Sequence, residues 1–239
     1  MSDAIVAGLE ALLAGFDAVL GGGYSAVLYG SAARGGHVEG RSDVNVLLIL
    51  DDVTPPALRA LGPKLAAWRK AGHPAPLLLS RREWARSADI FPIELADIVS
   101  AHRLLRGADP VAGVQVVPAD LRLALERDFA AGLMRLRQGL ALHGGAPAEL
   151  GEIARGAAAP VVALCRGLLA LAGRAVPAEP ADVIRMTAGV VGFSPTAPVA
   201  VVAARHERKW KCPPETFEGF LAAVESAATF VDSFTPGVR

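Results

Sequence analysis

The sequence is poor in cysteine, and this argues against two kinds of architecture. The two cysteines, Cys165 and Cys212, lie far apart, and neither belongs to a CxxC motif or to a Cys/His spacing typical of zinc ligands. A disulfide framework and a cysteine-ligated zinc site are therefore not indicated. We expect both residues to be free thiols, because an unpaired cysteine behaves as a small hydrophobic residue.

The sequence also lacks an excess of charge of either sign. It has 24 Lys and Arg residues and 24 Asp and Glu residues, so no overall field attracts the chain to nucleic acid or to anionic lipid. The tryptophans stand outside any stretch that interleaves basic and aromatic residues, which is the pattern typical of nucleic-acid binding. We therefore expect no nucleic acid among the partners, and any positive charge that binds phosphate must be local.

A long apolar segment without helix breakers is missing too. The longest uncharged stretch, residues 187–204, contains Pro195 and Pro198 and two glycines, so it is a poor membrane-spanning helix. The N-terminus carries Asp3 and Glu10 and has no basic flank, so it does not have the pattern of a signal peptide. We expect a cytoplasmic protein with no membrane partner.

In the first half of the chain, apolar stretches of strand length alternate with stretches of helical periodicity. In residues 4–20 apolar side chains recur every three or four positions, and glycines at 21–23 end this predicted helix. Further predicted helices cover residues 56–71 and 81–88, and predicted strands cover residues 24–30, 44–50, 75–80 and 91–98. The alternation predicts a sheet with helices packed against it.

From Pro118 onward, every long segment has helical periodicity. The predicted helices cover residues 119–142, 148–173, 181–191, 198–210 and 214–234. Pro160 is expected to kink or split the second of them, because proline removes a hydrogen bond from a helix interior. Short loops between such helices are typical of a bundle. We therefore predict an α+β chain of two domains, with a mixed sheet and flanking helices in residues 1–115 and an all-α helical bundle in residues 116–239.

Residues 28–50, LYGSAARGGHVEGRSDVNVLLIL, have the pattern of a phosphate-binding turn. A strand that ends at Gly30 and turns through Ser31 into a short helix directs backbone N–H groups beyond the edge of the sheet, where an anion can bind. Glycine lets a phosphate approach the backbone closely, and the Ser31 hydroxyl can donate to a phosphate oxygen. Arg34 and Arg41 add local positive charge.

The next predicted strand opens with Asp43-Val44-Asn45. Because successive side chains of a strand point to opposite faces, Asp43 and Asn45 share one face. Two oxygen ligands beside an anion site suit a divalent cation that is bound with a nucleoside triphosphate. A Gly-Ser turn or an Asp-x-Asn turn cap is common by itself, and the combination at this spacing is more specific.

Two common nucleotide-binding motifs are excluded in this stretch. Gly36-His37 stand where a P-loop requires Lys and Ser or Thr, and the dinucleotide-binding fingerprint lacks a glycine between Gly30 and Gly35. Instead, GSAARG followed by SDVNVLLIL resembles the signature of the DNA polymerase beta-like nucleotidyltransferase superfamily. Within it, the pattern is similar to bacterial nucleotidyltransferase domains with a helical C-terminal domain, among which are the aminoglycoside adenylyltransferases. Specific motifs carry the resemblance in the first domain, and helical character and size carry it in the second.

The resemblance implies a nucleotidyltransferase-fold sheet and a set of site residues. In that superfamily a Gly-Ser pair holds the triphosphate, and two carboxylates of an Asp-x-Asp motif and a third from a later strand hold Mg²⁺. The residues implied to bind the phosphates of ATP or another nucleotide are Gly30, Ser31, Arg34 and Ser42. The residues implied to hold Mg²⁺ and support catalysis are Asp43, Asn45 and Glu94, with Asn45 in place of the second Asp.

The third acidic residue has two candidates, Glu94 and Asp97. On a regular strand over residues 91–98 they would face opposite sides, because they are three positions apart. The resemblance favours Glu94, although an exposed glutamate in a structural ion pair would give the same pattern.

Because Asn45 stands in place of the second Asp, three functions stay open. The first is a Mg²⁺-dependent nucleotidyltransferase that moves a nucleotidyl group, AMP from ATP, to a hydroxyl of a small-molecule acceptor. The second is a weakened or inactive homologue that binds nucleotide without turnover, since an amide oxygen holds Mg²⁺ less well than a carboxylate. The third is a protein-interaction module comparable to the antitoxin of a toxin–antitoxin pair. The sequence assigns no particular acceptor and no oligomeric state.

Overall fold

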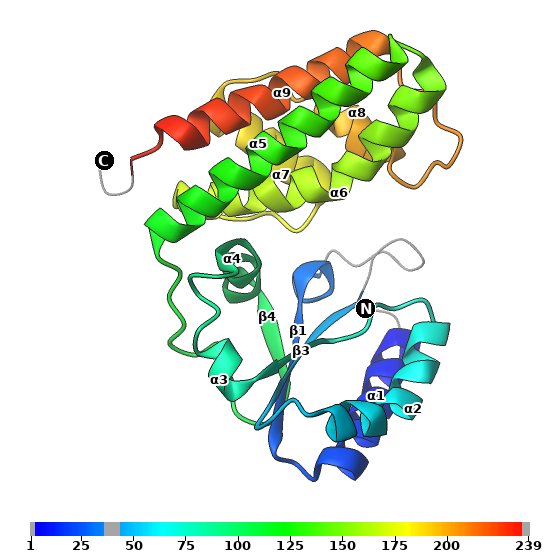
Figure 1. Cartoon of the computed structure of the whole chain (residues 1–239), viewed down its shortest axis with the longest axis vertical. Coiled ribbons are helices and arrows are strands. Elements are labelled where there is room, and N and C mark those ends of the chain that lie inside the picture. Colours follow the sequence, from blue (N-terminus) through cyan, green and yellow to red (C-terminus); the bar gives the residue numbers. More distant parts are fainter. Residues whose placement is uncertain (1–2, 36–43, 236–239) are drawn as a thin grey trace. The chain divides into compact units, whose positions relative to one another are not determined.

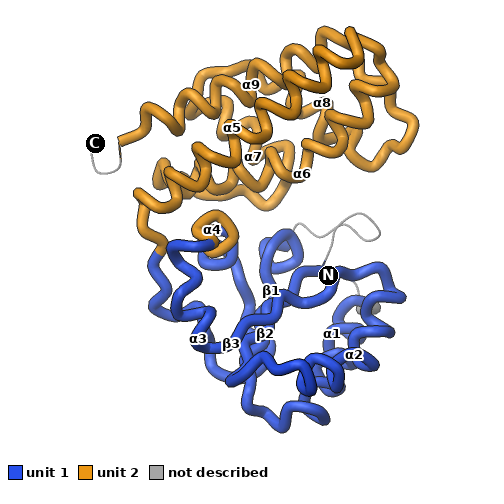
Figure 2. Tube along the Cα trace, in the orientation of Figure 1, with its two compact units in different colours: residues 1–90, 97–115 blue, residues 91–96, 116–239 orange. Residues whose placement is uncertain are grey.

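The computed structural model describes residues 3–35 and 44–235, and it divides into two compact units (Figure 2). The first unit comprises residues 1–90 and 97–115, and the second comprises residues 91–96 and 116–239. Each unit has a hydrophobic core of its own. Residues 91–96 belong with the second unit because Ile93 and Ala96 are buried in its core.

The first unit is built on a mixed sheet with the strand order β3-β2-β1-β4. The strands are β1 Tyr24–Tyr29, β2 Asn45–Leu50, β3 Leu77–Ser80 and β4 His102–Arg106. The central strand β1 pairs antiparallel with both β2 and β4, and β2 pairs parallel with β3. A mixed sheet with flanking helices, followed by a helical part, confirms the predicted α+β class.

The helices of the first unit are α1 Asp3–Leu20, α2 Pro55–Lys70 and α3 Arg81–Trp84. In Figure 1, α1 and α2 lie side by side, and they contact each other. Their apolar faces form one core with both central strands, in which Phe16 is fully buried and Trp68 nearly so. The indole N–H of Trp68 donates to the carbonyl oxygen of Pro74 at 2.8 Å, which satisfies the one polar group that this side chain buries.

The prediction of a strand over residues 91–98 is wrong, because these residues form helix α4, Pro92–Ser100. Pro92 occupies a first helical turn, where its missing N–H costs no hydrogen bond, and Glu94 lies in the same turn, where the helix dipole favours a carboxylate. Ile93 and Ala96 recur at helical spacing and both are buried. Short apolar runs of this kind fit either a strand or a helix by periodicity alone.

Strand β4 was not expected, and its sequence explains the omission. Three of its five residues, HRLLR, are basic or imidazole-bearing, and the strand lies at one edge of the sheet, exposed or half-buried throughout. Arg106 ties this edge strand to α1, because its guanidinium pairs with Glu10 at 2.9 Å and with Asp17 at 3.4 Å. Charged side chains are common on edge strands, where they discourage pairing with other chains.

The second unit contains the helices α5 to α9. Their bounds are Pro118–His143, Pro147–Leu171, Pro180–Val191, Thr196–Ala204 and Pro214–Ser233. In Figure 1, α5 lies beside α6 and α9, and it contacts both. Four of these helices place a proline in their first turn, where its missing N–H costs no hydrogen bond.

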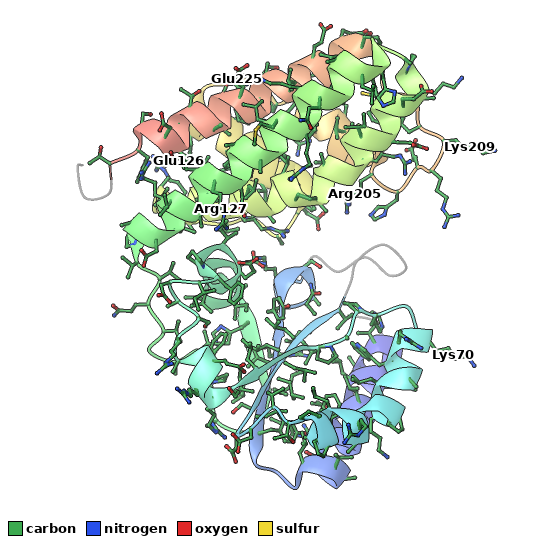
Figure 3. All side chains as sticks on the ribbon, in the orientation of Figure 1. Lys70, Glu126, Arg127, Arg205, Lys209 and Glu225 are labelled. Atoms are coloured by element: carbon green, nitrogen blue, oxygen red, sulfur yellow. The ribbon has the colours of Figure 1, made fainter. Side chains whose placement is uncertain are left out.

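Two details of the predicted helices differ in the structure. Pro160 does not split α6, because the proline and the preceding turn at Gly156 are exposed and solvent can replace the lost hydrogen bond. A kink at Pro160 stays a prediction. Helix α8 ends at Ala204 and not at residue 210. The Arg205–Lys211 segment beyond it, in which Figure 3 labels Arg205 and Lys209, is exposed except for the half-buried Arg205 and Trp210, so it offers no continuous apolar stripe to bury.

Helix α6 is long and apolar enough to cross a membrane by length and composition alone. Half of the relevant window is buried within the structure, and residues from Leu150 to Leu169 contribute to the core of the second unit. The core helix of a helical bundle has the same properties. The composition of α6 is therefore explained by its packing.

Both cysteines are free and buried, which confirms the sequence-based expectation. Burial raises the pKa of the Cys165 thiol to about 12 and that of the Cys212 thiol to about 11. The reactive form of a cysteine is the thiolate, so both side chains are inert packing groups at neutral pH. The backbone N–H of Cys212 donates to the carbonyl oxygen of Pro147 at 2.8 Å, which holds the segment before α9 against the start of α6.

Gly151→Ala on α6 is expected to destabilise the second unit, because the added methyl group would lie 2.2 Å from the backbone oxygen of Trp210. The expected loss of unfolding free energy is about 1–3 kcal/mol, the usual cost of an extra group in a packed core. Gly156→Ala on the same helix is the matched control, since its methyl group would meet none of the described residues within 4 Å. That variant should be unchanged or up to about 1 kcal/mol more stable, because alanine favours helix. Urea denaturation measures both, and equal midpoints would contradict this account of the packing.

Candidate functional site

The candidate site begins where β1 ends, at Gly30. This residue is buried and has a φ of +75°, a backbone conformation that side chains other than glycine rarely adopt. It opens the short 3₁₀ turn Gly30–Ala32, and the backbone N–H of Arg34 donates to the Gly30 carbonyl oxygen at 3.2 Å. The chain therefore reverses sharply at the edge of the sheet, as the Gly-Ser pair predicts.

Asn45 lies next to this turn on the neighbouring strand. Tyr29 and Asn45 are partners in the antiparallel register of β1 and β2, so β2 begins where β1 ends. A Cβ atom on Gly30 would lie 2.9 Å from Nδ2 of Asn45. A glycine is thus required at position 30 both by the positive φ and by the half-buried amide beside it.

The same edge of the sheet carries two further residues. Ser31 follows Gly30 in the turn and is half-buried. His102 opens β4 opposite Tyr29, and its imidazole Nε2 lies 3.2 Å from an oxygen of the Asp109 carboxylate. Ser42 and Asp43, which the sequence assigns to phosphate and to metal, lie outside the described residues.

Arg34 is held by an ion pair in the first unit. Its guanidinium lies 2.8 Å and 3.3 Å from the two carboxylate oxygens of Asp97, and its side chain is 4% exposed. It also donates to the backbone carbonyl oxygen of Asp97 at 2.9 Å and to the Ser100 hydroxyl at 2.5 Å. The predicted contact of Arg34 with phosphate stays a prediction, and what the structure shows is this set of contacts with α4.

Glu94 and Asp97 differ in their surroundings. Since both lie on the helix α4, their side chains leave it on neighbouring faces, which corrects the opposite faces expected for a strand. Glu94 is exposed. On α5, the hydrogen bond and the charge of Asp128 raise the pKa of Arg127 above its ordinary value, and the Glu94 carboxylate adds to this through its charge.

The described residues alone do not make up a Mg²⁺ site. Within residues 3–35 and 44–235, no group of three or more His, Cys, Asp or Glu side chains comes together in a way that could hold a metal. Asn45 offers one neutral oxygen, and the Asp97 carboxylate is engaged by Arg34. Mg²⁺ prefers several oxygen ligands, usually with one or two carboxylates among them, so the predicted site depends on Asp43.

Comparison with solved structures finds a similar architecture. The structure of spectinomycin adenyltransferase AAD(9) from Enterococcus faecialis with ATP and spectinomycin aligns with a TM-score of 0.58 and 12% sequence identity. The alignment covers 95% of this chain and 99% of that one. The chain has the nucleotidyltransferase fold. At this identity the likeness establishes the fold, including its helical C-terminal part, and leaves activity and ligands to be argued from the site. No protein-family model and no curated protein sequence matches the chain.

Sequence reasoning found the turn and Asn45 but not the partners of Arg34. Asp97 was weighed as a metal ligand, and Ser100 was not considered. They lie 63 and 66 positions after Arg34, so no local spacing pairs them. The partners of Arg34 emerge only from the tertiary structure.

Gly30→Ala is expected to destabilise the first unit more than Gly72→Ala, although both glycines have positive φ values, +75° and +89°. The left-handed conformation costs an alanine about 1–2 kcal/mol at either position. At position 30 the new methyl group also meets the Asn45 amide, whereas at position 72 it meets none of the described residues within 4 Å.

Thermal unfolding of both variants measures this difference. When Asn45→Ala is also present, Gly30→Ala should lose no more unfolding free energy than Gly72→Ala does, because the Asn45 amide is absent. Equal costs at the two glycines, or an excess that persists without the amide, would contradict the close approach of Gly30 and Asn45.

Proposed function

We propose that this protein is a nucleotidyltransferase that transfers a nucleotidyl group, AMP from ATP, to a hydroxyl of a small-molecule acceptor. The observation that carries the proposal is the left-handed turn at Gly30 with the Asn45 amide against it, at the sheet edge of a nucleotidyltransferase fold. The similar structure was obtained with ATP and spectinomycin, a nucleotide and a small molecule, which supports the same two classes of ligand here.

The phosphates of the nucleotide bind at the turn. Gly30 has no side chain to block their approach, and the N–H groups of Ser31 and Ala32 are the backbone donors proposed for them, because those of Ala33 and Arg34 already donate to the Gly30 carbonyl oxygen. The hydroxyls of Ser31 and Ser42 donate to phosphate oxygens. Asp43, Asn45 and Glu94 are the residues that would hold Mg²⁺, which neutralises negative charge on the phosphates when it is bound.

The reaction is an in-line displacement at the α-phosphorus of ATP. The oxygen of the acceptor hydroxyl forms a bond to this phosphorus, the bond to the bridging oxygen breaks, and pyrophosphate leaves with that electron pair. The hydroxyl proton passes to a general base. If Glu94 does not hold Mg²⁺, it is the proposed base, because its carboxylate is exposed, whereas that of Asp97 is committed to Arg34.

A second candidate function is nucleotide binding without turnover. The position that holds the second carboxylate in the superfamily is the neutral amide of Asn45, and its Nδ2 points at the turn. With Asp97 engaged, Asp43 and Glu94 are the carboxylates left for Mg²⁺ among the proposed residues. Fewer anionic ligands weaken metal binding more than they weaken the contacts of backbone N–H groups with phosphate.

Isothermal titration should show ATP binding in the presence of Mg²⁺, and Ser31→Ala should weaken it by about tenfold to a hundredfold, because a hydrogen bond to a charged phosphate is worth about 1.5–3 kcal/mol. Ser226→Ala is the matched control. Its hydroxyl donates to the Ala222 carbonyl oxygen of its own helix at 2.9 Å, so ATP affinity should not change.

The transfer step is measured with labelled ATP and a library of small hydroxyl-bearing acceptors. Label transfer supports the enzyme, and ATP binding with no transfer to any acceptor supports the second candidate. An absence of ATP binding at millimolar concentration would rule out both.

Asn45→Asp should tighten the binding of ATP several-fold when Mg²⁺ is present, because it restores an anionic metal ligand. Without Mg²⁺ the same change should weaken ATP binding, since a carboxylate would then face the phosphates unscreened. Titration with ATP at matched ionic strength, with and without Mg²⁺, measures both effects. An effect of the same sign in both conditions would show that position 45 does not face a metal.

A further inference from the structure

Arg34 terminates the turn that begins at Gly30. Its backbone N–H closes the turn by donating to the Gly30 carbonyl oxygen, and its side chain reaches across to α4. The first end of the turn is fixed by the pairing of Tyr29 with Asn45. The second end is fixed by Asp97 and Ser100. Ser31, the proposed phosphate ligand, lies between the two fixed ends.

The contacts of Arg34 with α4 form a closed set of hydrogen bonds. The guanidinium donates to both carboxylate oxygens and to the backbone oxygen of Asp97. The Ser100 hydroxyl accepts from Arg34 and donates to that same backbone oxygen at 2.8 Å. These groups lie in the last turn of α4, where the helix dipole favours a cation, and the Asp97 carbonyl oxygen also accepts from the backbone N–H of Ala101 at 3.3 Å.

The same contacts leave Arg34 poorly placed to bind a phosphate. With the side chain 4% exposed, most of its N–H groups already have acceptors. A phosphate would have to displace Asp97 and leave a partly buried carboxylate without its partner, which is strongly unfavourable. A planar guanidinium that is hydrogen-bonded to both oxygens of a carboxylate has one preferred geometry. The pair of Arg34 and Asp97 therefore suits the role of fixing the backbone at Arg34.

We propose that Arg34, Asp97 and Ser100 form a positioning clamp that holds the Gly30–Arg34 turn in the conformation that binds phosphate, and that Arg34 itself does not contact the nucleotide. This rests on the proposed function, because the turn is taken as the phosphate site. The clamp makes ATP affinity depend on Asp97, a residue that carries the same sign of charge as the ligand.

Asp97→Asn and Arg34→Gln test the clamp, because a direct ligand and a positioning residue predict opposite results for Asp97. If the clamp holds the turn, each variant lowers ATP affinity by about tenfold or more, as expected when a supporting contact of a binding site is lost. The double variant should then be no worse than the more affected single variant. If Arg34 contacted phosphate directly, Asp97→Asn would leave ATP affinity unchanged or improve it, and this result would overturn the proposal.

Hydrogen exchange of the peptide that covers residues 30–35 gives a readout that needs no nucleotide. Both variants should exchange faster there than the wild-type protein, and unchanged exchange would overturn the clamp. Arg81→Gln is the matched control, because Arg81 pairs with Asp51 at 2.6 Å in the same unit but with both side chains more than half exposed. It should change neither exchange in residues 30–35 nor ATP affinity.

Thermal unfolding separates the clamp from a general loss of structure. Titrations are made well below the unfolding midpoint of each variant. Arg34→Lys keeps the positive charge but loses the planar guanidinium, so its ATP affinity should lie between those of the wild-type protein and Arg34→Gln. A variant that lowers the midpoint while ATP affinity stays at the wild-type value would overturn the proposal. If the wild-type protein binds no ATP, the proposed function fails, and the role of the clamp in phosphate binding fails with it. The exchange rates still decide separately whether the clamp fixes the turn.

Discussion

The close approach of Gly30 to the Asn45 amide is the constraint on which the candidate site depends. It follows from the antiparallel pairing of β1 with β2, which sets Tyr29 opposite Asn45 and leaves the next residue no room for a side chain. The positive φ of Gly30 then turns the chain back over the sheet edge. The proposed phosphate-binding turn and the proposed metal ligand Asn45 are thereby brought together by backbone geometry before any ligand is considered.

The core of the first unit holds the two residues of this constraint. The buried strands β1 and β2, packed with α1 and α2, fix the positions of Gly30 and Asn45. Helix α4 is divided between the two units, since Ile93 and Ala96 are buried in the core of the helical unit and Asp97 pairs with Arg34 in the first.

The two carboxylates of α4 differ in their contacts. Asp97 neutralises Arg34, and together they hold the backbone after Ser31. Glu94 is exposed. On the neighbouring strand Asn45 carries no charge, so it meets the buried glycine without the cost of desolvating an anion. The neutral side chain thus suits the packing at Gly30.

Much of the local structure was predictable from the sequence because it follows from short-range periodicity. The ends of the central strands β1 and β2 and of the helices α1 and α2 each lie within one residue of the predicted ends. The long helices of the second unit were marked by their apolar spacing and by prolines at their starts. The errors lie where short-range patterns are ambiguous: α4 has an apolar run of strand length, and β4 is a basic edge strand.

The sequence by itself determined the turn at Gly30, the strand that opens at Asn45 and the division into a sheet part and a helical part. These features depend on residues close together in the chain, whose conformational preferences and burial patterns are local. The tertiary structure alone decided that Arg34 is paired with Asp97 and Ser100, and that Glu94 and Asp97 leave a helix on neighbouring faces. The partners of Arg34 lie more than 60 positions away, and contacts over that separation are selected by the packing of whole elements.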